Sequence, residues 1–312
     1  SLKMATRAGV EAAFKLIHST LPPTPVLTSS TLDEMVGCKI YWKCEHLQKT
    51  GSFKARGALY NVSLLKERGA KGVITHSSGN HGQAVAWAAR KLGLPCTVVV
   101  PQNAPATKVE AIKGYGAQLA RCGNAITDRE SECARLAAEL GYEIIEPFDR
   151  KETIEGQGTL GLEMAQQIDD VDAIFVSVGG GGLASGLSLA FPSKRLYLVE
   201  PEGKMLQLQL DGAHGDDRSA LRTVADGIRV RVIGENNRMV LKAHEDKAII
   251  NVTDEEIREA LILIWTRLKQ HVEPTAAVAF AGLRRLATEG PLPFKTAAII
   301  LCGGNVDVSF VP

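Results

Sequence analysis

Short apolar runs alternate with helical patterns along the chain, and this alternation constrains the fold more than any other feature. Most of the runs are continuously apolar, which is typical of strands buried on both faces of a parallel sheet. The predicted strands are residues 39–43, 72–75, 96–100, 118–121, 143–146, 173–178, 195–199 and 297–301. The predicted helices between them are residues 82–91, 106–114, 128–140 and 159–167. The pattern predicts an α/β fold with parallel-rich, twisted sheets flanked by helices.

The chain has 312 residues, which is enough for two lobes. Turn residues near Lys71 and Pro147 flank a self-contained β-α stretch. We therefore expect residues 72–147 to form a small, mobile domain, with residues 1–71 and 148–312 forming a large cofactor-binding domain. Thr253, followed three residues later by Glu256, predicts a capped helix start.

The composition excludes several classes of function. Basic and acidic residues nearly cancel, at a formal net charge of +1, and aromatic residues are only 5%, so nucleic-acid binding is not expected. No apolar run approaches the ~18 residues that span a bilayer, so no membrane contact is expected. The six cysteines are scattered and form no Cys-x-x-Cys pair, which favours a reduced, cytoplasmic location over a disulfide framework.

A lysine at the start of a predicted helix is the first candidate for chemistry. Residues 49–57 place a glycine turn before a helix, with Lys54 in its first turn. The positive end of the helix dipole disfavours a charged lysine, and a neutral amine is the form that condenses with an aldehyde. For this motif alone, a surface lysine without chemistry is the alternative interpretation.

Two glycine-containing loops each follow a predicted strand and open a helix. The first, residues 77–83, reads Ser-Ser-Gly-Asn-His-Gly-Gln, and the second has four consecutive glycines at positions 179–182. Ligands bind at the carboxyl ends of strands in α/β sheets, and backbone amides at a helix start hold anions. We expect the first loop to hold a substrate carboxylate, with an ordinary turn as the alternative. We expect the second to hold a monoester phosphate, because the pyrophosphate and nucleoside-triphosphate fingerprints are missing there.

The last predicted strand ends in Leu-Cys-Gly-Gly-Asn at residues 301–305. A neutral thiol is a weak hydrogen-bonding group, which suits an unprotonated pyridine nitrogen. Cys302 is therefore a candidate cofactor contact, and a buried core cysteine is the alternative.

In this order and spacing, the four motifs resemble the fold-type II pyridoxal-phosphate enzymes, which include the tryptophan synthase β-subunit, threonine and serine dehydratases, and serine racemases. The resemblance runs from about Thr24 to Asn305 and includes the segments 155–159 and 273–276. It implies a two-lobed fold with pyridoxal 5'-phosphate in the cleft between the lobes. It also implies a homodimer that acts on a small amino acid.

The resemblance assigns roles position by position. Lys54 would form an imine with the cofactor and act as a base, and the substrate would contact Arg129, with Tyr115 nearby. The other expected cofactor contacts are Phe53, Asn80, Gly179, Gly180, Gly181, Gly182, Leu183 and Cys302. The expected contacts to the substrate carboxylate are Ser77, Ser78, Asn80 and His81.

Ser78 separates two closely related activities. Serine racemases have serine at this position, whereas threonine dehydratases usually have alanine. A hydroxyl facing Lys54 would supply the second acid/base that racemisation needs. The resemblance therefore favours a serine racemase with β-elimination of serine to pyruvate and ammonia. The alternatives are a dehydratase of serine, threonine or 3-hydroxyaspartate with little racemisation, and a binding protein that has lost catalysis.

Two accessory sites are also implied. A divalent cation, Mg²⁺ or Ca²⁺, is expected near Glu200 and Lys204, although Leu206 stands where a second carboxylate is expected. ATP is expected as an effector at a set of common surface residue types. Its expected contacts are Ser30, Thr31, Lys49, Thr50, Gln83 and, from a neighbouring subunit, Lys269.

Overall fold

Six strands form the larger of two sheets in the computed structural model, which describes residues 4–213, 219–307 and 309–312. The strand order is β1-β2-β10-β7-β8-β9, and all neighbours are parallel except β1 and β2. The strands are β1 Val26–Leu27, β2 Lys39–Lys43, β7 Ala173–Ser177, β8 Arg195–Pro201, β9 Lys247–Val252 and β10 Thr296–Ile300. The central strand β7 is buried along its whole length, as its continuous apolar sequence predicts.

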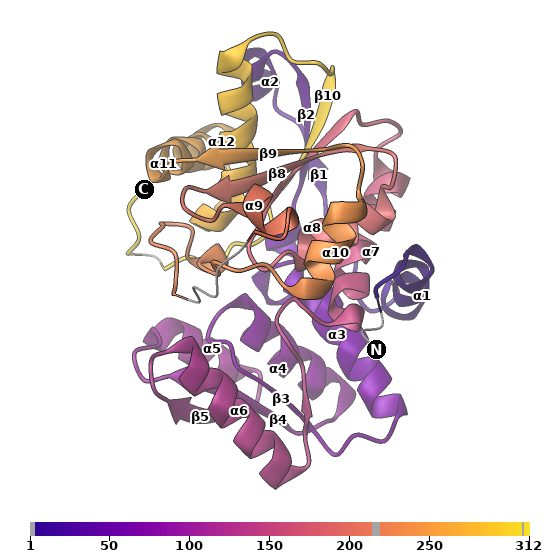
Figure 1. Ribbon diagram of the computed structural model, residues 1–312, viewed down its shortest axis with the longest axis vertical. Coiled ribbons are helices and arrows are strands. Elements are labelled where there is room, and N and C mark those ends of the chain that lie inside the picture. The colour runs from indigo at the N-terminus through magenta and orange to yellow at the C-terminus, as the bar shows by residue number, and fades with distance from the viewer. Residues whose placement is uncertain (1–3, 214–218, 308) are drawn as a thin grey trace.

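A second sheet has four parallel strands in the order β5-β4-β3-β6. The strands are β3 Val73–Thr75, β4 Cys96–Pro101, β5 Gln118–Cys122 and β6 Glu143–Ile144. This sheet and the helices between its strands form the lower part of Figure 1, and the six-stranded sheet forms the upper part. The second sheet thus comes from one continuous stretch of chain within the predicted small domain. The mobility of that stretch stays a prediction.

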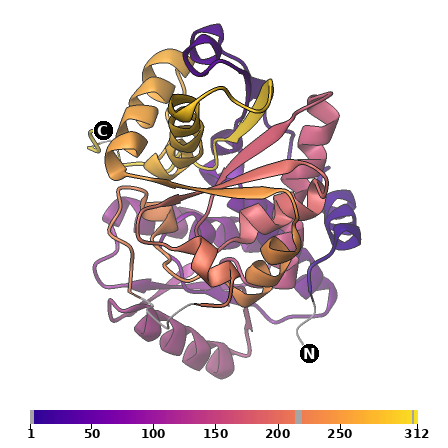
Figure 2. The ribbon, with the colours of Figure 1, turned by 45° about the horizontal axis from the view of Figure 1, so that its top comes forward.

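Helices cover both faces of the larger sheet: α7 and α8 pack on one face, and α11 and α12 on the other (Figures 1 and 2). The helices are α1 Arg7–Ile17, α2 Ser30–Val36, α3 Lys54–Glu67, α4 Asn80–Leu92, α5 Ala106–Gly114, α6 Ile126–Leu140, α7 Lys151–Gln167, α8 Gly182–Ala190, α9 Leu206–Leu210, α10 Glu235–Ala243, α11 Asp254–Leu263 and α12 Pro274–Glu289. Short helical turns are η1 Glu45–Leu47, η2 Lys49–Gly51, η3 Asp226–Ile228 and η4 Ile264–Leu268. The predicted α/β class is confirmed.

Helix α3 joins the two halves of the molecule. Its apolar side chains share a hydrophobic cluster with α1, α4 and the strands β3 and β4. Its other side packs against α7, where a Cβ on Gly57 would come within 2.5 Å of the Gln157 side chain. Because α3 packs against α1 and α4 on one side and against α7 on the other, its first residue, Lys54, has a fixed place between the two sheets.

The sequence did not predict strands β1 and β9, helices α2, α9, α10 and α12, or the first half of α7. Strand β1 has only two residues, and β9 is a partly exposed edge strand with no strong pattern. Helix α7 begins eight residues before the predicted start, because Gly156 and Gly158 obscured its pattern. These glycines allow close helix contacts: a Cβ on Gly156 would lie 2.6 Å from the Gly57 Cα, and one on Gly158 would lie 2.8 Å from the Gly186 carbonyl oxygen. The capping box of Thr253 and Glu256 is confirmed at the start of α11.

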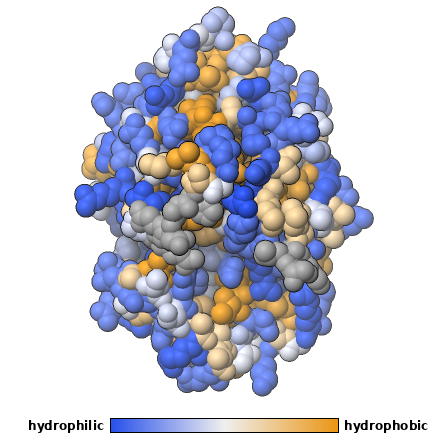
Figure 3. All heavy atoms as spheres, viewed as in Figure 1, coloured by the Kyte–Doolittle hydropathy of each residue, from blue (hydrophilic) through white to orange (hydrophobic). Residues whose placement is uncertain are grey.

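The surface is mostly hydrophilic in the view of Figure 3, with apolar residues in separate patches. Among the described residues, no helix is both long and apolar enough to cross a lipid bilayer.

Candidate active site

The predicted site residues meet where strands of both sheets end. An isolated bridge pairs Ser52 with Gly303, and the Phe53 amide donates to the Cys302 carbonyl oxygen at 3.1 Å. This pairing places the start of α3 beside the end of β10. The start of α4 reaches the same point through Asn80, whose side-chain amide donates to both Glu273 oxygens at 3.0 and 3.1 Å. Segments more than 200 residues apart in the sequence therefore form one site.

Lys54 carries an amine with an unusually low proton affinity. Its Nζ donates a hydrogen bond to the Pro147 carbonyl oxygen at 2.7 Å and lies 5.1 Å from the centre of the Phe53 ring. Burial lowers the pKa of Lys54 to about 8, against a weak opposing effect of Cys302. About a tenth of this amine is therefore neutral and nucleophilic at pH 7, far more than for an ordinary lysine.

Glu273 is the main functional candidate that the sequence did not assign. It is buried at the start of α12. It accepts hydrogen bonds from the Asn80 side chain and, at 3.1 Å, from the backbone amide of Asn305. Burial raises the pKa of Glu273 to about 7, although the Asn80 hydrogen bond opposes that shift. In the sequence, Glu273-Pro274 indicates only a helix start, because proline is common in the first turn of a helix. Nothing in the sequence predicts that Glu273 pairs with a residue of α4.

Asn80 is held at both ends of its side-chain amide. While its nitrogen donates to Glu273, its oxygen accepts a hydrogen bond from the Asn305 side chain at 2.8 Å. Asn305 also donates to the Thr50 carbonyl oxygen at 2.7 Å. This chain of hydrogen bonds fixes the orientation of Asn80 and connects the beginning of α4 to both α12 and η2.

The glycine loop between β7 and α8 has no room for side chains. A Cβ on Gly179 would lie 2.8 Å from Ile228, one on Gly180 would lie 2.1 Å from the Phe148 ring, and one on Gly181 would lie 2.7 Å from Asn237. Gly181 also has a φ of +101°, which favours glycine. The loop opens helix α8, whose N-terminal amides and dipole attract an anion such as a phosphate.

Cys302 is a neutral thiol in this environment. It is buried at the end of β10, and the Ser177 hydroxyl donates to its Sγ at 3.7 Å. Burial, reinforced by the Glu273 charge, raises the pKa of Cys302 far above its usual range. A protonated thiol can donate a weak hydrogen bond to a pyridine nitrogen but cannot protonate it. This agrees with the sequence-based expectation that Cys302 suits a cofactor whose pyridine nitrogen is neutral.

The 77–81 segment lies between β3 and the first turn of α4. The buried His81 ring places Nε2 3.1 Å from the Ile145 carbonyl oxygen, so Nε2 carries the proton. Burial and the nearby Lys54 charge lower the pKa of His81 to about 3. Its neutral ring therefore offers a carboxylate no donor at Nδ1. The available donors are the serine hydroxyls and the backbone amides of this segment.

Arg129 in α6 lies close enough to His76, which directly follows β3, to affect its pKa. Burial is the main cause of the lowered pKa of His76, and the Arg129 charge lowers it further. The Arg129 Nε is buried, and it finds no hydrogen-bond partner among the residues that the structure describes. Arg129 thus has an Nε that is unpaired within the described chain, and it lies near His76, the residue before the segment expected to bind the substrate. Tyr115 caps the end of α5 and packs against the cluster around α3 and α4.

The residues expected to bind a divalent cation do not fit one. The buried Lys204 side chain is itself a cation and would repel a metal ion. Leu206 is apolar and buried, so it supplies no ligand. Burial lowers the pKa of Lys204 to about 8, with Glu200 opposing the shift. The described residues contain no cluster of three or more histidine, cysteine, aspartate or glutamate side chains that could hold a metal.

The expected nucleotide contacts are divided between surface and interior. Gln83 and Thr50 are buried, and the other four residues are exposed: Ser30, Thr31, Lys49 and Lys269. Thr50 and Lys269 share an uncommon left-handed backbone conformation, with φ of 62° and 61°. ATP binding at these residues stays a prediction.

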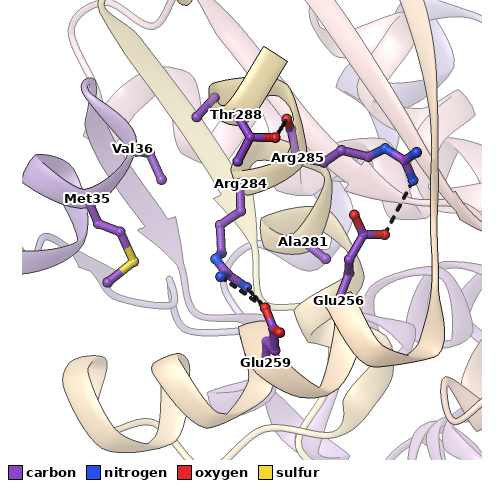
Figure 4. A pocket seen from close by; sticks show the side chains of 9 residues that line it. Met35, Val36, Glu256, Glu259, Ala281, Arg284, Arg285 and Thr288 are labelled. Carbon is purple, nitrogen blue, oxygen red and sulfur yellow. Dashed lines mark hydrogen bonds and ion pairs between the residues drawn. The ribbon is translucent and has the colours of Figure 1, made fainter. Parts of the chain in front are cut away.

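A surface pocket lies apart from these residues, between α2, α11 and α12 (Figure 4). Two ion pairs line it, Arg284 with Glu259 and Arg285 with Glu256. None of the predicted site residues contributes to it, so this pocket does not bear on the chemistry described above.

A buried lysine of lowered pKa, a neutral thiol and a glycine loop at a helix start are features of enzymes that hold a phosphorylated aldehyde through a lysine. A family model described as "Pyridoxal-phosphate dependent enzyme" matches residues 17–303. The chain belongs to this family of pyridoxal-phosphate-dependent enzymes, in its racemase and ammonia-lyase branch. The family predicted from the motifs is therefore confirmed.

Three relatives illustrate the branch. The chain is 39% identical to a serine racemase of Dictyostelium discoideum, covering 98% of this chain and 96% of that protein. It is 42% identical to L-threo-3-hydroxyaspartate ammonia-lyase of Saccharomyces cerevisiae, covering 97% and 94% of the two chains. A solved structure of a pyridoxal 5'-phosphate-dependent aspartate racemase superimposes with a TM-score of 0.95 at 39% identity, covering 100% and 99%.

The lowered pKa of Lys54 predicts a pH dependence for cofactor loading. Below pH 8 the amine is protonated and has no lone pair, so the rate of covalent binding to the apoprotein should rise about tenfold per pH unit and level off above pH 8. Stopped-flow absorbance at the imine band measures this rate. Pyridoxine 5'-phosphate, which lacks the aldehyde, should bind without this dependence. A midpoint near pH 10 would contradict the assigned environment of Lys54.

Proposed function

We propose that this enzyme is a serine racemase that also eliminates water from serine to give pyruvate and ammonia. The observation that carries the proposal is that the two acid/base groups, Lys54 and Ser78, come from segments that adjoin different sheets. Lys54 follows Ser52, which is bridged to Gly303 just beyond β10 of the six-stranded sheet, whereas Ser78 follows β3 of the four-stranded sheet. Racemisation needs one proton-transfer group on each side of the α-carbon, and two segments that adjoin different sheets can supply them.

Lys54 and Ser78 divide the proton transfers in this proposal. Pyridoxal phosphate, when bound, withdraws the electron pair that is left at the α-carbon when its proton departs. The neutral Lys54 amine takes the α-proton of L-serine on one face. The Ser78 hydroxyl delivers a proton to the α-carbon on the other face, and the roles are exchanged for D-serine. Elimination instead expels the β-hydroxyl, which takes up a proton and leaves as water; the released aminoacrylate then takes up one water and gives pyruvate and ammonia.

Other residues of the chain bind and orient in this proposal. The loop from Gly179 to Leu183 holds the phosphate, Phe53 packs against the ring, and Cys302 faces the ring nitrogen. Asn80, fixed by Glu273 and Asn305, contacts the ring oxygen. The substrate carboxylate is held by the amides and hydroxyls of residues 77–81.

Replacing Ser78 separates racemisation from elimination. In Ser78→Ala, D-serine formation from L-serine should fall at least about 100-fold, because no group returns the proton on the second face. Elimination from L-serine should persist, while elimination from D-serine should be lost with racemisation. Chiral chromatography of serine and a coupled assay of pyruvate measure the three rates in one preparation. Unchanged racemisation would remove Ser78 from the proposed role.

A second candidate is an enzyme for four-carbon dicarboxylic amino acids, either eliminating from 3-hydroxyaspartate or racemising aspartate. Arg129 favours it, since its buried Nε is available near His76, which precedes the 77–81 segment, and a guanidinium suits a second carboxylate. The hydroxyaspartate ammonia-lyase and the aspartate racemase among the relatives support it as well.

Arg129→Met distinguishes the two candidates. If Arg129 binds a second carboxylate, kcat/KM for L-threo-3-hydroxyaspartate or aspartate should fall about 10- to 100-fold, and that for serine should change little. Arg135→Met, an exposed arginine on the same helix, serves as the matched control. An equal loss for serine and dicarboxylates would assign Arg129 a general role and favour the serine enzyme.

Three expectations accompany the proposal. A homodimer and a cytoplasmic location follow from the family resemblance and from the scattered cysteines. Tuning of activity by ATP is expected from the residues around Thr50 and Gln83. Sedimentation velocity and assays with and without ATP test the first and the third.

A further inference from the structure

Lys204 is a lysine whose side chain is almost completely buried, with 1% of its surface exposed. It lies in the turn that follows β8, between Gly203 and Met205, which both have positive φ values of 85° and 60°. This tight turn brings the chain back on itself. As a result, the Leu206 amide donates to both oxygens of the buried Glu200 carboxylate, at 3.2 and 3.0 Å.

The Lys204 ammonium is surrounded by oxygen acceptors. Its Nζ donates to the Val230 carbonyl oxygen at 2.6 Å and to the Arg231 carbonyl oxygen at 3.2 Å, and Glu200 acts on it electrostatically. Main-chain carbonyls and a carboxylate are the ligands that a hard metal cation prefers. In this chain a covalently attached cation already satisfies them.

The contacts of Lys204 lead to the glycine loop. Its two acceptors belong to a segment, residues 228–234, that runs from the last residue of η3 to the start of α10. At one end of the segment Ile228 packs on Gly179, and at the other Ile233 lies against Gly181. The Gly234 amide also donates to the Gly180 carbonyl oxygen at 3.1 Å.

A glutamine strengthens the same connection. Gln209 in α9 donates to the Lys204 and Arg231 carbonyl oxygens at 2.6 and 3.1 Å, and its own oxygen accepts from the Ile233 amide at 2.8 Å. Helices α9 and α10 pack side by side below β8 in Figure 1. Lys204 and Gln209 thereby hold the 228–234 segment against the glycine loop between β7 and α8.

We propose that Lys204 is a built-in cation that holds the 228–234 segment against the glycine loop, so that this enzyme needs no divalent metal ion at this place. Lys204 is a positioning residue in this proposal: it touches neither cofactor nor substrate, and it acts through Ile228, Ile233 and Gly234. The proposal does not depend on the role of Ser78 or on which amino acid is the substrate.

The first experiment uses the wild-type holoenzyme and the apoprotein. After dialysis against EDTA, the melting temperature of both forms and the affinity of the apoprotein for pyridoxine 5'-phosphate should be unchanged. Addition of 1 mM Mg²⁺, Ca²⁺ or Mn²⁺ should shift the melting temperature by less than about 1 °C, since no vacant oxygen site is available. A loss on EDTA treatment that one of these ions restores would overturn the proposal.

The second experiment replaces the ammonium. Lys204→Met keeps most of the apolar stem but removes the ammonium. The Val230 carbonyl then loses its Lys204 donor, and the Arg231 carbonyl loses Lys204 but keeps Gln209, so the affinity for pyridoxine 5'-phosphate should fall about tenfold or more. Lys242→Met, an exposed lysine on α10, is the matched control and should behave as wild type. Wild-type affinity and melting temperature in Lys204→Met would also overturn the proposal.

A third variant remains informative if Lys204→Met does not fold. Lys204→Ala combined with Leu206→Asp removes the ammonium and adds a carboxylate next to Glu200. This protein should gain at least about 3 °C in melting temperature from 1 mM Ca²⁺ or Mg²⁺ and recover affinity for pyridoxine 5'-phosphate. Failure of both ions to stabilise it would show that the acceptors around Lys204 do not form a cation site.

Discussion

Lys54→Ala should lower both racemisation and elimination at least about 1,000-fold, the largest effect on activity expected from any single substitution in this chain. The amine is the group that both attaches the cofactor and takes the α-proton in the proposed mechanism. Its lowered pKa, about 8, makes it ready for both tasks. Alanine removes them together, so kcat should fall rather than KM alone rise.

The loss in Lys54→Ala can be separated from a failure to fold. Lys66→Ala changes an exposed lysine further along the same helix α3 and should retain full activity. The Lys54→Ala apoprotein should melt no lower than wild type, because a buried amine is exchanged for an apolar methyl group. Borohydride reduction followed by peptide mapping should label Lys54 in the wild type only. Labelling of another residue, or retained activity in the variant, would refute the assignment.

Arg56→Met should destabilise the fold by about 3 to 5 kcal/mol, the largest stability effect expected from a single charge removal. Two positions after Lys54, Arg56 is buried and donates to Glu45 at 2.8 Å through both Nε and Nη2. It also donates to Glu163 at 2.9 Å, and Glu163 is paired in turn with the buried Lys43. Removing one member leaves a buried carboxylate without its partner.

The pKa values of this cluster show how strongly its charges depend on one another. Burial acts to raise the pKa of Glu45, but the attraction and hydrogen bonds of Arg56 outweigh it and hold the pKa below the usual range. The contribution of Glu45 is therefore present at neutral pH and is lost when the pH falls through its lowered pKa. Acid should release the start of α3, and with it Lys54.

Thermal and urea unfolding of the apoprotein measure the effect of Arg56→Met. A loss of 3 to 5 kcal/mol corresponds to a fall in melting temperature of roughly 6 °C or more. Arg135→Met removes an exposed arginine paired with Glu132 and Glu139 on α6, and should leave the melting temperature nearly unchanged. If the two variants melt together, the buried cluster does not hold α3 in place. Glu45→Gln tests the same cluster with a smaller change if Arg56→Met is insoluble.

Local patterns were enough to locate most of the elements of this fold. Continuous apolar runs identified strands such as β4 and β7, because strands buried on both faces need no polar alternation. Glycines identified the loops after β3 and β7. In the second loop the reason is steric, because Ile228, Phe148 and Asn237 leave no room for a Cβ at residues 179–181. The same residue type misled the prediction in α7, where Gly156 and Gly158 serve the contact of one helix with another.

The sequence by itself determined the class of the enzyme and predicted the residues that we propose to carry its chemistry, since each motif is a short segment with characteristic residue types. Only the tertiary structure decided which groups act on one another. The pairing of Asn80 with Glu273, of Arg56 with Glu163 and of Lys204 with the Val230 carbonyl joins residues between 26 and 193 positions apart. The physical reason is that proton affinity and hydrogen-bond satisfaction depend on the burial and charges around a group, and both are set by neighbours in space rather than neighbours in the chain.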